Sequence, residues 1–337
     1  MAEAGLEHGG RLREAARRFA IPVDDWLDLS TGINPLGWPV PPLAPECWQR
    51  LPEPDDGLPE AAAGYYGSDQ LLPVAGSQAA IQALPRLRPA CRVGVLAPAY
   101  AEHRRAWEGA GHQVEPVAAD AVADAAERLD ALVLVHPNNP TGATFPREQL
   151  LHWHRTLAAR GGWLVVDEAF MDPTPEASLA PEAGAEGLVV LRSLGKFFGL
   201  AGARVGFVLT GPDLRRGLDA YLGPWAVSHP AREIARRALA DTAWQQATRA
   251  RLNEAGRRLA ALLAAHGLAP AGGTALFQWA PTHRAETVWR ALAEQGILIR
   301  RFDDPPALRL GLPGEEAEWR RLEAALRKVA APSVHGT

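Results

Sequence analysis

SLGKFFGLAGARVG, residues 193–206, contains Lys196, one of only two lysines in a chain of 337 residues. The other lysine is Lys328, and every remaining basic side chain is an arginine. Arginine stays protonated under ordinary conditions, whereas a partly buried lysine can lose its proton and act as a nucleophile. A lysine kept in this Gly-rich apolar stretch therefore indicates a chemical use of its amine, while Lys328 fits a lysine at the surface of a terminal helix.

Short apolar segments alternate with amphipathic ones on both sides of this stretch. The apolar segments predict strands at 92–98, 131–137, 162–169, 188–195 and 203–210. The amphipathic segments between them predict helices at 77–87, 101–111 and 147–161. Strands that are apolar on both faces and separated by helices are typical of a parallel sheet with covered faces. The pattern predicts an α/β fold with a mostly parallel central sheet flanked by helices.

The flanking regions differ from this pattern and predict a division into three parts. Residues 1–35 read as an N-terminal arm, followed by Pro-rich loops. The large sheet-containing domain is expected at 36–220. Longer helices and a few short strands after that point predict a smaller α+β C-terminal domain at 221–337.

Composition excludes several classes of protein. The net charge of −4 lacks the basic excess of a nucleic-acid-binding surface. Two cysteines, Cys47 and Cys91, stand far apart, which suits a reducing compartment and gives neither a disulfide framework nor a metal cluster. We expect no metal site, no secretory signal and no membrane span, and hence a cytoplasmic protein.

Four features that follow strands or open helices are candidates for a ligand site, because open α/β sheets bind ligands at this edge. AGSQAAI, 75–81, is a small-residue turn whose free N–H groups would face an anion, although such a turn is more often a helix cap. HPNNPTG, 136–142, is a rigid turn that presents the amide of Asn139. Asp167 ends an apolar strand, where a carboxylate needs a cationic partner. Lys196, with Ser193 before it and Arg204 after it, is the fourth.

In chain order the motifs AGSQ, PAY, HPNNPTG, VVDEAF and SLGKFFGLAGARVGF resemble those of the fold-type I pyridoxal-phosphate enzymes, the class I/II aminotransferase superfamily, over essentially the whole chain. The resemblance implies the aminotransferase-like fold type I and the cofactor pyridoxal 5'-phosphate. It implies that Lys196 is the Schiff-base lysine, that Asp167 partners the pyridinium nitrogen, and that Asn139 donates to the phenolic oxygen. Tyr100 is implied to stack on the cofactor ring. The implied phosphate-binding residues are Gly76, Ser77, Gln78, Ser193 and Arg204.

Three further segments, EHGGRLREAA at 7–16, DLSTGINPLG at 28–37 and ILIRRFDDPPALRLGLP at 297–313, resemble the threonine-phosphate decarboxylases of cobalamin biosynthesis, relatives of the histidinol-phosphate aminotransferases. That branch decarboxylates L-threonine O-3-phosphate to (R)-1-aminopropan-2-yl phosphate. By resemblance Arg309 clamps the substrate carboxylate. The implied contacts to the substrate phosphate are His8, Asn34 and Arg300, with Arg301 left open as an alternative to Arg300.

Two positions depart from the aminotransferase pattern. Phe170 stands where aminotransferases commonly have Tyr, and it lacks a hydroxyl group for the phenolic oxygen of the cofactor. Leu51 stands where relatives place a Tyr that reaches the partner subunit's cofactor phosphate, so this contact of the implied homodimer is in doubt.

The alternatives are a histidinol-phosphate-type or other aminotransferase on the same fold, and a non-catalytic ligand-binding module. The presence of Lys196 disfavours the binding module. A nicotinamide dehydrogenase would need G-x-G-x-x-G after the first strand, and the sequence has no such motif there, which argues against that class.

Overall fold

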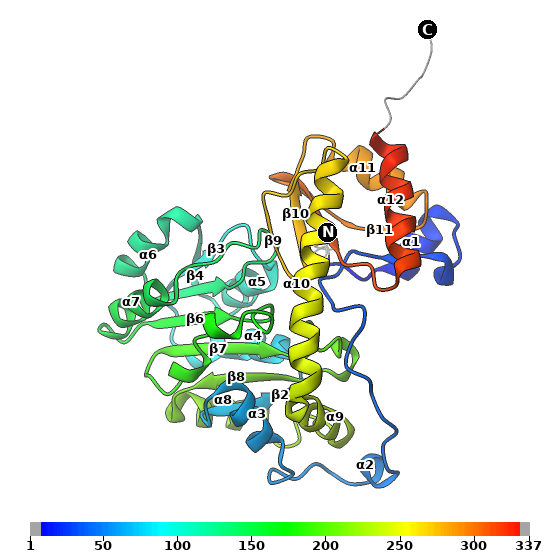
Figure 1. Ribbon diagram of the computed structural model, residues 1–337. Helices are drawn as coiled ribbons and strands as arrows, with labels where there is room; N and C mark the ends of the chain where they lie inside the picture. The colour runs from blue at the N-terminus through cyan, green and yellow to red at the C-terminus, as the bar shows by residue number, and fades with distance from the viewer. Residues whose placement is uncertain (1–7, 331–337) are drawn as a thin grey trace. The chain divides into compact units, whose positions relative to one another are not determined.

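The computed structural model describes residues 8–330 and divides into two compact units (Figure 1). Unit 2 comprises residues 37–139 and 143–249, and the described part of unit 1 comprises 8–36, 140–142 and 250–330. The predicted boundaries at 35/36 and 220/221 stay a prediction, although packing groups residues 221–249 with unit 2.

A seven-stranded sheet with the order β2-β8-β7-β6-β5-β3-β4 forms the centre of unit 2. Pairing is parallel from β7 to β4, and β8 is antiparallel to both of its neighbours. The mostly parallel sheet predicted from the sequence is therefore confirmed. The strands are β2 (Leu71–Val74), β3 (Arg92–Leu96), β4 (Gln113–Val117), β5 (Ala131–Val135), β6 (Trp163–Asp167), β7 (Leu188–Ser193) and β8 (Gly206–Thr210).

Both faces of this sheet are buried, which explains why its strands read as continuous apolar runs. On one face, Val133, Val165 and Val189 pack in one cluster with Trp107 and Leu218, side chains from covering helices. On the other face the alternate strand residues, among them Leu132, are also fully buried. The helices of unit 2 are α2 (Glu46–Gln49), α3 (Leu58–Tyr66), α4 (Ser77–Ala83), α5 (Ala101–Gly109), α6 (Val122–Arg128), α7 (Arg147–Ala158), α8 (Pro212–Leu222), α9 (His229–Ala240) and the start of α10 (Thr242–Ala265).

Unit 1 contains two smaller sheets. A four-stranded antiparallel sheet has the order β12-β13-β10-β9, and β1 pairs in parallel with β11. The strands are β1 (Leu27–Asp28), β9 (Gly272–Thr274), β10 (Phe277–Pro281), β11 (Ile297–Leu298), β12 (Arg300–Asp303) and β13 (Pro306–Gly311). The helices are α1 (Leu12–Phe19), α11 (Ala285–Ala293), α12 (Glu316–Ala330) and the remainder of α10. Among residues 8–330, no helix has the length and apolar character needed to cross a bilayer.

Strands β2 and β4 were not predicted from the sequence. Each is short and contains a proline, Pro73 in β2 and Pro116 in β4, a residue that argues against a central strand. Both strands lie at the edges of the seven-stranded sheet, where a missing N–H donor is tolerated. The segment ILIRRF, residues 297–302, divides between β11 and β12, which belong to different sheets.

We expect Leu132→Ala to lower the free energy of unfolding by about 2–5 kcal/mol, because Leu132 is fully buried on central strand β5 and its truncation leaves a cavity. Urea denaturation followed by circular dichroism measures the change. Val40→Ala is the matched control, since Val40 is 53% exposed. Equal stabilities of the two variants would contradict the assignment of β5 to the core.

Candidate functional site

A cavity of about 140 Å³ lies in unit 2, at the edge where β6 and β7 end. It is lined by Ser77, Gln78, Tyr100, Val135, Asn139, Asp167, Ala169, Phe170, Ser193, Gly195, Lys196, Ala201 and Arg204. Because the strands are parallel, loops that are distant in sequence meet at this edge. The structure thus brings together all the residues that the sequence assigned to the cofactor, apart from Gly76, which directly precedes Ser77.

Asp167 at the end of β6 is paired with a histidine that the sequence analysis missed. His103 Nε2 lies 2.8 Å from Asp167 Oδ2, and the two side chains are 1% and 5% exposed. The other carboxylate oxygen accepts the Ala169 N–H at 3.1 Å. The carboxylate therefore has the hydrogen-bond partners that a buried charge requires. The available signal was the position of His103 in the first turn of α5, three residues after Tyr100, which directly precedes the helix.

The turn before α4 is shaped by glycines that leave room for other groups. Gly76 has a φ of +73°, and a Cβ there would lie 2.6 Å from Arg204 Nη2. A Cβ on Gly206 would lie 2.6 Å from the backbone nitrogen of Ser77. A side chain at either position would displace the Arg204 guanidinium or the backbone N–H of Ser77. The turn keeps these donors close together, an arrangement suited to an anion.

Gln78 is held by a chain of hydrogen bonds that also includes a second residue missed by the sequence analysis. The Tyr100 hydroxyl donates to Gln78 Oε1 at 3.2 Å, and Gln78 Nε2 donates to Glu102 Oε2 at 3.0 Å. Glu102 is buried, so these bonds fix the direction of the Gln78 amide. They also restrain the ring of Tyr100 at the cavity.

Lys196 follows β7 and lies in an apolar environment. Its Nζ is 5.6 Å from the centroid of the Phe170 ring. Phe170, Phe197 and Phe198 are all nearly or fully buried. The lysine thus presents its amine, the group that can act as a nucleophile toward an aldehyde, at the cavity.

The donors of the cavity fit pyridoxal phosphate. The glycine turn leaves space for a phosphate beside Arg204, and the paired carboxylate of Asp167 is suited to a protonated ring nitrogen. Lys196 supplies an amine, and Asn139 lines the same cavity. Within the part of the chain that the structure describes, no group of three or more His, Cys, Asp or Glu side chains is arranged to hold a metal ion.

The substrate residues expected from the sequence lie in unit 1. Arg300 on β12 and Arg309 on β13 are direct cross-strand partners. Arg309 is 3% exposed, and its Nη2 donates to the Ser30 carbonyl at 2.6 Å. Burial, and next the charge of Arg300, lower the pKa of Arg309 to about 9. Like charges directly opposite each other destabilise a sheet, so an anion beside this pair would relieve the repulsion.

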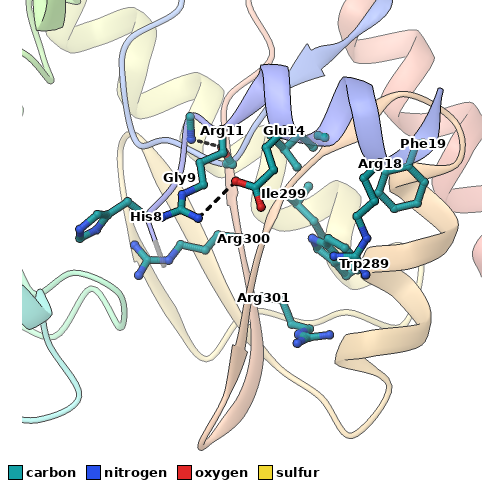
Figure 2. A pocket seen from close by; sticks show the side chains of 14 residues that line it. His8, Gly9, Arg11, Glu14, Arg18, Phe19, Trp289, Ile299, Arg300 and Arg301 are labelled. Carbon is teal, nitrogen blue, oxygen red and sulfur yellow. Dashed lines mark hydrogen bonds and ion pairs between the residues drawn. The ribbon is translucent and has the colours of Figure 1, made fainter. Parts of the chain in front are cut away.

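Arg300 also lines a second cavity, of about 150 Å³, which lies within unit 1 (Figure 2). His8, Gly9, Gly10 and Arg11 line the same cavity. The backbone at Gly9 lies close to that of Ser30, so that only glycine fits: a Cβ at residue 9 would lie 2.3 Å from the Ser30 carbonyl oxygen.

The other candidates for the substrate phosphate are engaged elsewhere in unit 1. Arg301 also reaches the second cavity, but its guanidinium pairs with Glu286 and, at 3.1 Å, with Asp303. Asn34 is buried and accepts the Leu36 N–H at 3.0 Å, so it organises a turn and does not line the cavity. The choice between Arg300 and Arg301 stays a prediction.

Comparison with known proteins gives a consistent result. The family model described as aminotransferase class I and II matches residues 48–326. The chain is 55% identical to a threonine-phosphate decarboxylase of Pseudomonas aeruginosa, covering 97% of this chain and 99% of the relative. A threonine-phosphate decarboxylase of a Sinorhizobium species is 43% identical, with 97% and 99% covered. The crystal structure of the histidinol-phosphate aminotransferase from Clostridium acetobutylicum superposes with a TM-score of 0.80 at 22% identity, covering 90% of this chain and 99% of that one.

We expect Gly76→Ala to weaken the binding of pyridoxal phosphate by about tenfold or more, because the added Cβ displaces Arg204 and strains a left-handed backbone. Absorbance titration of cofactor-free protein measures the affinity. Gly64→Ala is the matched control, since a Cβ on Gly64 meets no atom within 4 Å. An unchanged affinity in Gly76→Ala would remove the turn from the cofactor site.

Proposed function

Because the chain belongs to the aminotransferase class I and II family, we propose that it is a pyridoxal-phosphate-dependent decarboxylase. Its substrate is L-threonine O-3-phosphate, and its products are (R)-1-aminopropan-2-yl phosphate and CO2. The observation that carries this proposal is the 55% identity to a threonine-phosphate decarboxylase along 97% of the chain. The paired arginines of unit 1 support it, since the substrate carries two anionic groups.

Each predicted cofactor residue has a defined task in this proposal. Lys196 would hold the aldehyde carbon, and Asp167, held by His103, would keep a proton on the ring nitrogen. Arg204 and the turn at Gly76 and Ser77 bind the phosphate. The remaining contacts come from Gln78, Tyr100, Asn139 and Ser193. When bound, pyridoxal phosphate supplies an electron-withdrawing ring that accepts the electron pair of the bond that breaks at Cα.

The substrate residues decide which bond breaks. The fork of Arg309 binds the α-carboxylate, and Arg300 with His8 binds the phosphate; Asn34 supports this segment through its turn. Holding the substrate at both anionic ends orients the bond between Cα and the carboxylate for cleavage. Lys196, in its ammonium form, would donate to Cα the proton that replaces CO2, and would regain a proton from water.

The main alternative is an aminotransferase, including the histidinol-phosphate type, on the same fold. Amino transfer requires a 2-oxo acid as acceptor, whereas decarboxylation needs none. Phe170 supports decarboxylation, because it lacks the hydroxyl that aminotransferases commonly place there.

The proposal extends to assembly, location and pathway. We infer a homodimer, a state that would cover exposed apolar side chains such as Trp48, Leu51 and Trp225 with a second copy.

The free cysteines Cys47 and Cys91 support a reducing, cytoplasmic compartment. The product has the aminopropanol skeleton of the cobalamin nucleotide loop, which supports a role in cobalamin biosynthesis.

We expect the purified protein to release CO2 from L-threonine O-3-phosphate without a 2-oxo acid, with a product of the mass of aminopropan-2-yl phosphate. Lys196→Arg should reduce turnover by a factor of about 10⁴ or more, because a guanidinium cannot bind the aldehyde or deliver the proton. Labelled CO2 and product mass are measured together. Lys328→Arg is the control and should behave as the parent. Turnover that depends on a 2-oxo acid would replace this proposal with the aminotransferase.

We expect Arg309→Lys to raise KM for the phosphorylated substrate about 10- to 100-fold, because lysine keeps the charge and loses the bidentate fork. Cofactor affinity should stay at the parental value, since Arg309 does not line the cofactor cavity. Steady-state kinetics and cofactor titration separate the two effects. Loss of cofactor binding with an unchanged KM would refute the assignment of Arg309.

A further inference from the structure

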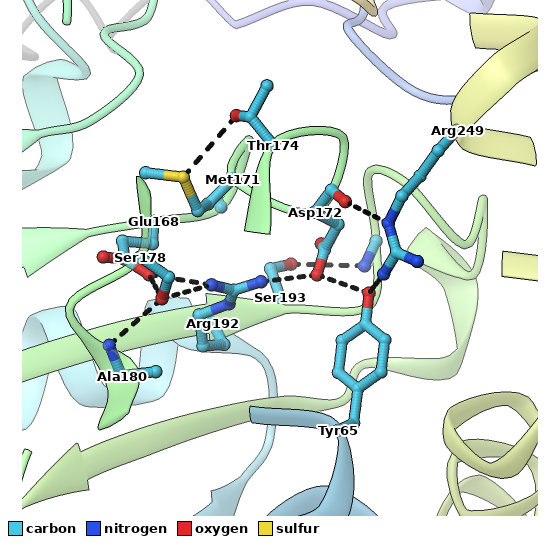
Figure 3. A network of polar contacts seen from close by, with 12 residues as sticks. Tyr65, Glu168, Met171, Asp172, Thr174, Ser178, Ala180, Arg192, Ser193 and Arg249 are labelled. Atoms are coloured by element: carbon cyan, nitrogen blue, oxygen red, sulfur yellow. Dashed lines mark hydrogen bonds and ion pairs between the residues drawn. The ribbon is translucent and has the colours of Figure 1, made fainter. Parts of the chain in front are cut away.

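A buried cluster of charged and polar side chains lies behind the strand ends that carry the cofactor residues (Figure 3). Its centre is Arg192, on β7, which the mechanism does not use. We define the Arg192 cluster as Arg192, Glu168, Asp172, Ser178, Tyr65 and Arg249. Glu168, Asp172 and Arg192 are 0%, 1% and 2% exposed, so the three charges are almost completely removed from water.

Arg192 binds two carboxylates at once. Its Nη1 donates to Glu168 Oε2 at 2.7 Å, and its Nη2 donates to Asp172 Oδ1 at 2.5 Å. Glu168 also accepts the Ser178 hydroxyl at 2.5 Å and the Leu179 N–H at 2.7 Å. Burial raises the pKa of Glu168, and the charge of Arg192 opposes this shift. The guanidinium therefore joins β7 to the loop that follows β6.

The cluster continues through a tyrosine. The Tyr65 hydroxyl donates to Asp172 Oδ1 at 3.0 Å and accepts from Arg249 Nη2 at 3.2 Å. Arg249 Nε donates to the Asp172 carbonyl at 2.9 Å. Asp172 is thus restrained through both its side chain and its backbone.

Stability alone does not explain this arrangement. Buried ion pairs lose so much hydration that well-packed apolar residues of similar volume are often equally or more stabilising. Breaking such a cluster at one member, in contrast, leaves an uncompensated buried charge. The best-attested use of buried charges is to select one register of packing over its neighbours.

Members of the cluster are neighbours of cofactor residues in the chain. Glu168 follows Asp167, and Arg192 precedes Ser193. Successive side chains of a strand point to opposite faces, so Asp167 and Ser193 reach the cofactor cavity while their neighbours reach the cluster. The ladder supports this register, because the Glu168 N–H donates to the Leu191 carbonyl at 2.9 Å.

A shift of β7 by one residue would turn Arg192 toward the cofactor side of the strand and Ser193 toward the cluster side. Arg192 would then be separated from its two carboxylates, and unpaired charges would be buried. We propose that Arg192 is a positioning residue, whose cluster fixes the register of β6 and β7 and so places Asp167, Ser193 and Lys196 at the cofactor. This inference rests on the proposed function, because it needs the cofactor to bind at Lys196.

The test compares the parent with the triple variant Glu168→Met/Asp172→Leu/Arg192→Met, which replaces the three almost fully buried charges with apolar side chains and keeps Arg249. The triple variant should lose less thermal stability than Arg192→Met alone, because the single variant leaves two buried carboxylates without their guanidinium. Cofactor-free triple variant should bind pyridoxal phosphate about tenfold or more weakly, with a shifted absorption maximum. Its kcat with threonine phosphate should fall about 100-fold. The exposed pair in Asp213→Leu/Arg216→Met is the control and should change none of these values.

A folded triple variant with parental cofactor affinity, absorption maximum and kcat would overturn the inference, because the cluster would then serve stability alone. If the triple variant does not fold, Arg192→Lys decides: its amine keeps the charge but cannot reproduce the fork. Weaker cofactor binding by folded Arg192→Lys supports the inference, and parental binding overturns it. A parent that binds no pyridoxal phosphate would instead refute the proposed function.

Discussion

The buried hydrogen-bonded pair of Asp167 and His103 is the constraint on which the rest of the site depends. A carboxylate that is nearly inaccessible to water is stable only with close partners, and His103 Nε2 lies 2.8 Å away. This requirement fixes the first turn of α5 against the end of β6. Tyr100 and Glu102 belong to the same turn, so they place Gln78 as a consequence of the same packing. One pair therefore orients groups from three separate parts of the chain.

The two units present different kinds of positive charge. In unit 2 the donors beside the glycine turn are backbone N–H groups and one guanidinium, which suits the small, fixed phosphate of a cofactor. In unit 1, Arg300 and Arg309 are direct partners on adjacent strands, and two like charges so placed favour a bound anion. A substrate with one carboxylate and one phosphate matches this second arrangement. Near Lys196, in contrast, the ring of Phe170 lies 5.6 Å from the amine, so one side of this lysine is apolar.

Much of the fold, and the set of residues that line the candidate cofactor cavity, could be predicted from the sequence, because both depend on local patterns. Parallel strands read as apolar runs, and ligand residues follow them at the edge where the strands end. His103 and Glu102 could not be predicted, since their roles arise only when α5 packs beside β6 and α4. Strands β2 and β4 were missed because each contains a proline. The long amphipathic segment that begins at residue 229 gives no sign of an interruption in its sequence pattern. In the structure it is divided at Asp241, which separates the end of α9 from the start of α10.

The chain offers an unusually direct test of the central claim, since it contains only two lysines. Protein incubated with pyridoxal phosphate, reduced with borohydride and digested can be mapped by mass spectrometry. The account predicts that the phosphopyridoxyl group is found on Lys196 and is absent from Lys328. Modification of Lys328 alone, or of neither lysine at saturating cofactor, would contradict it.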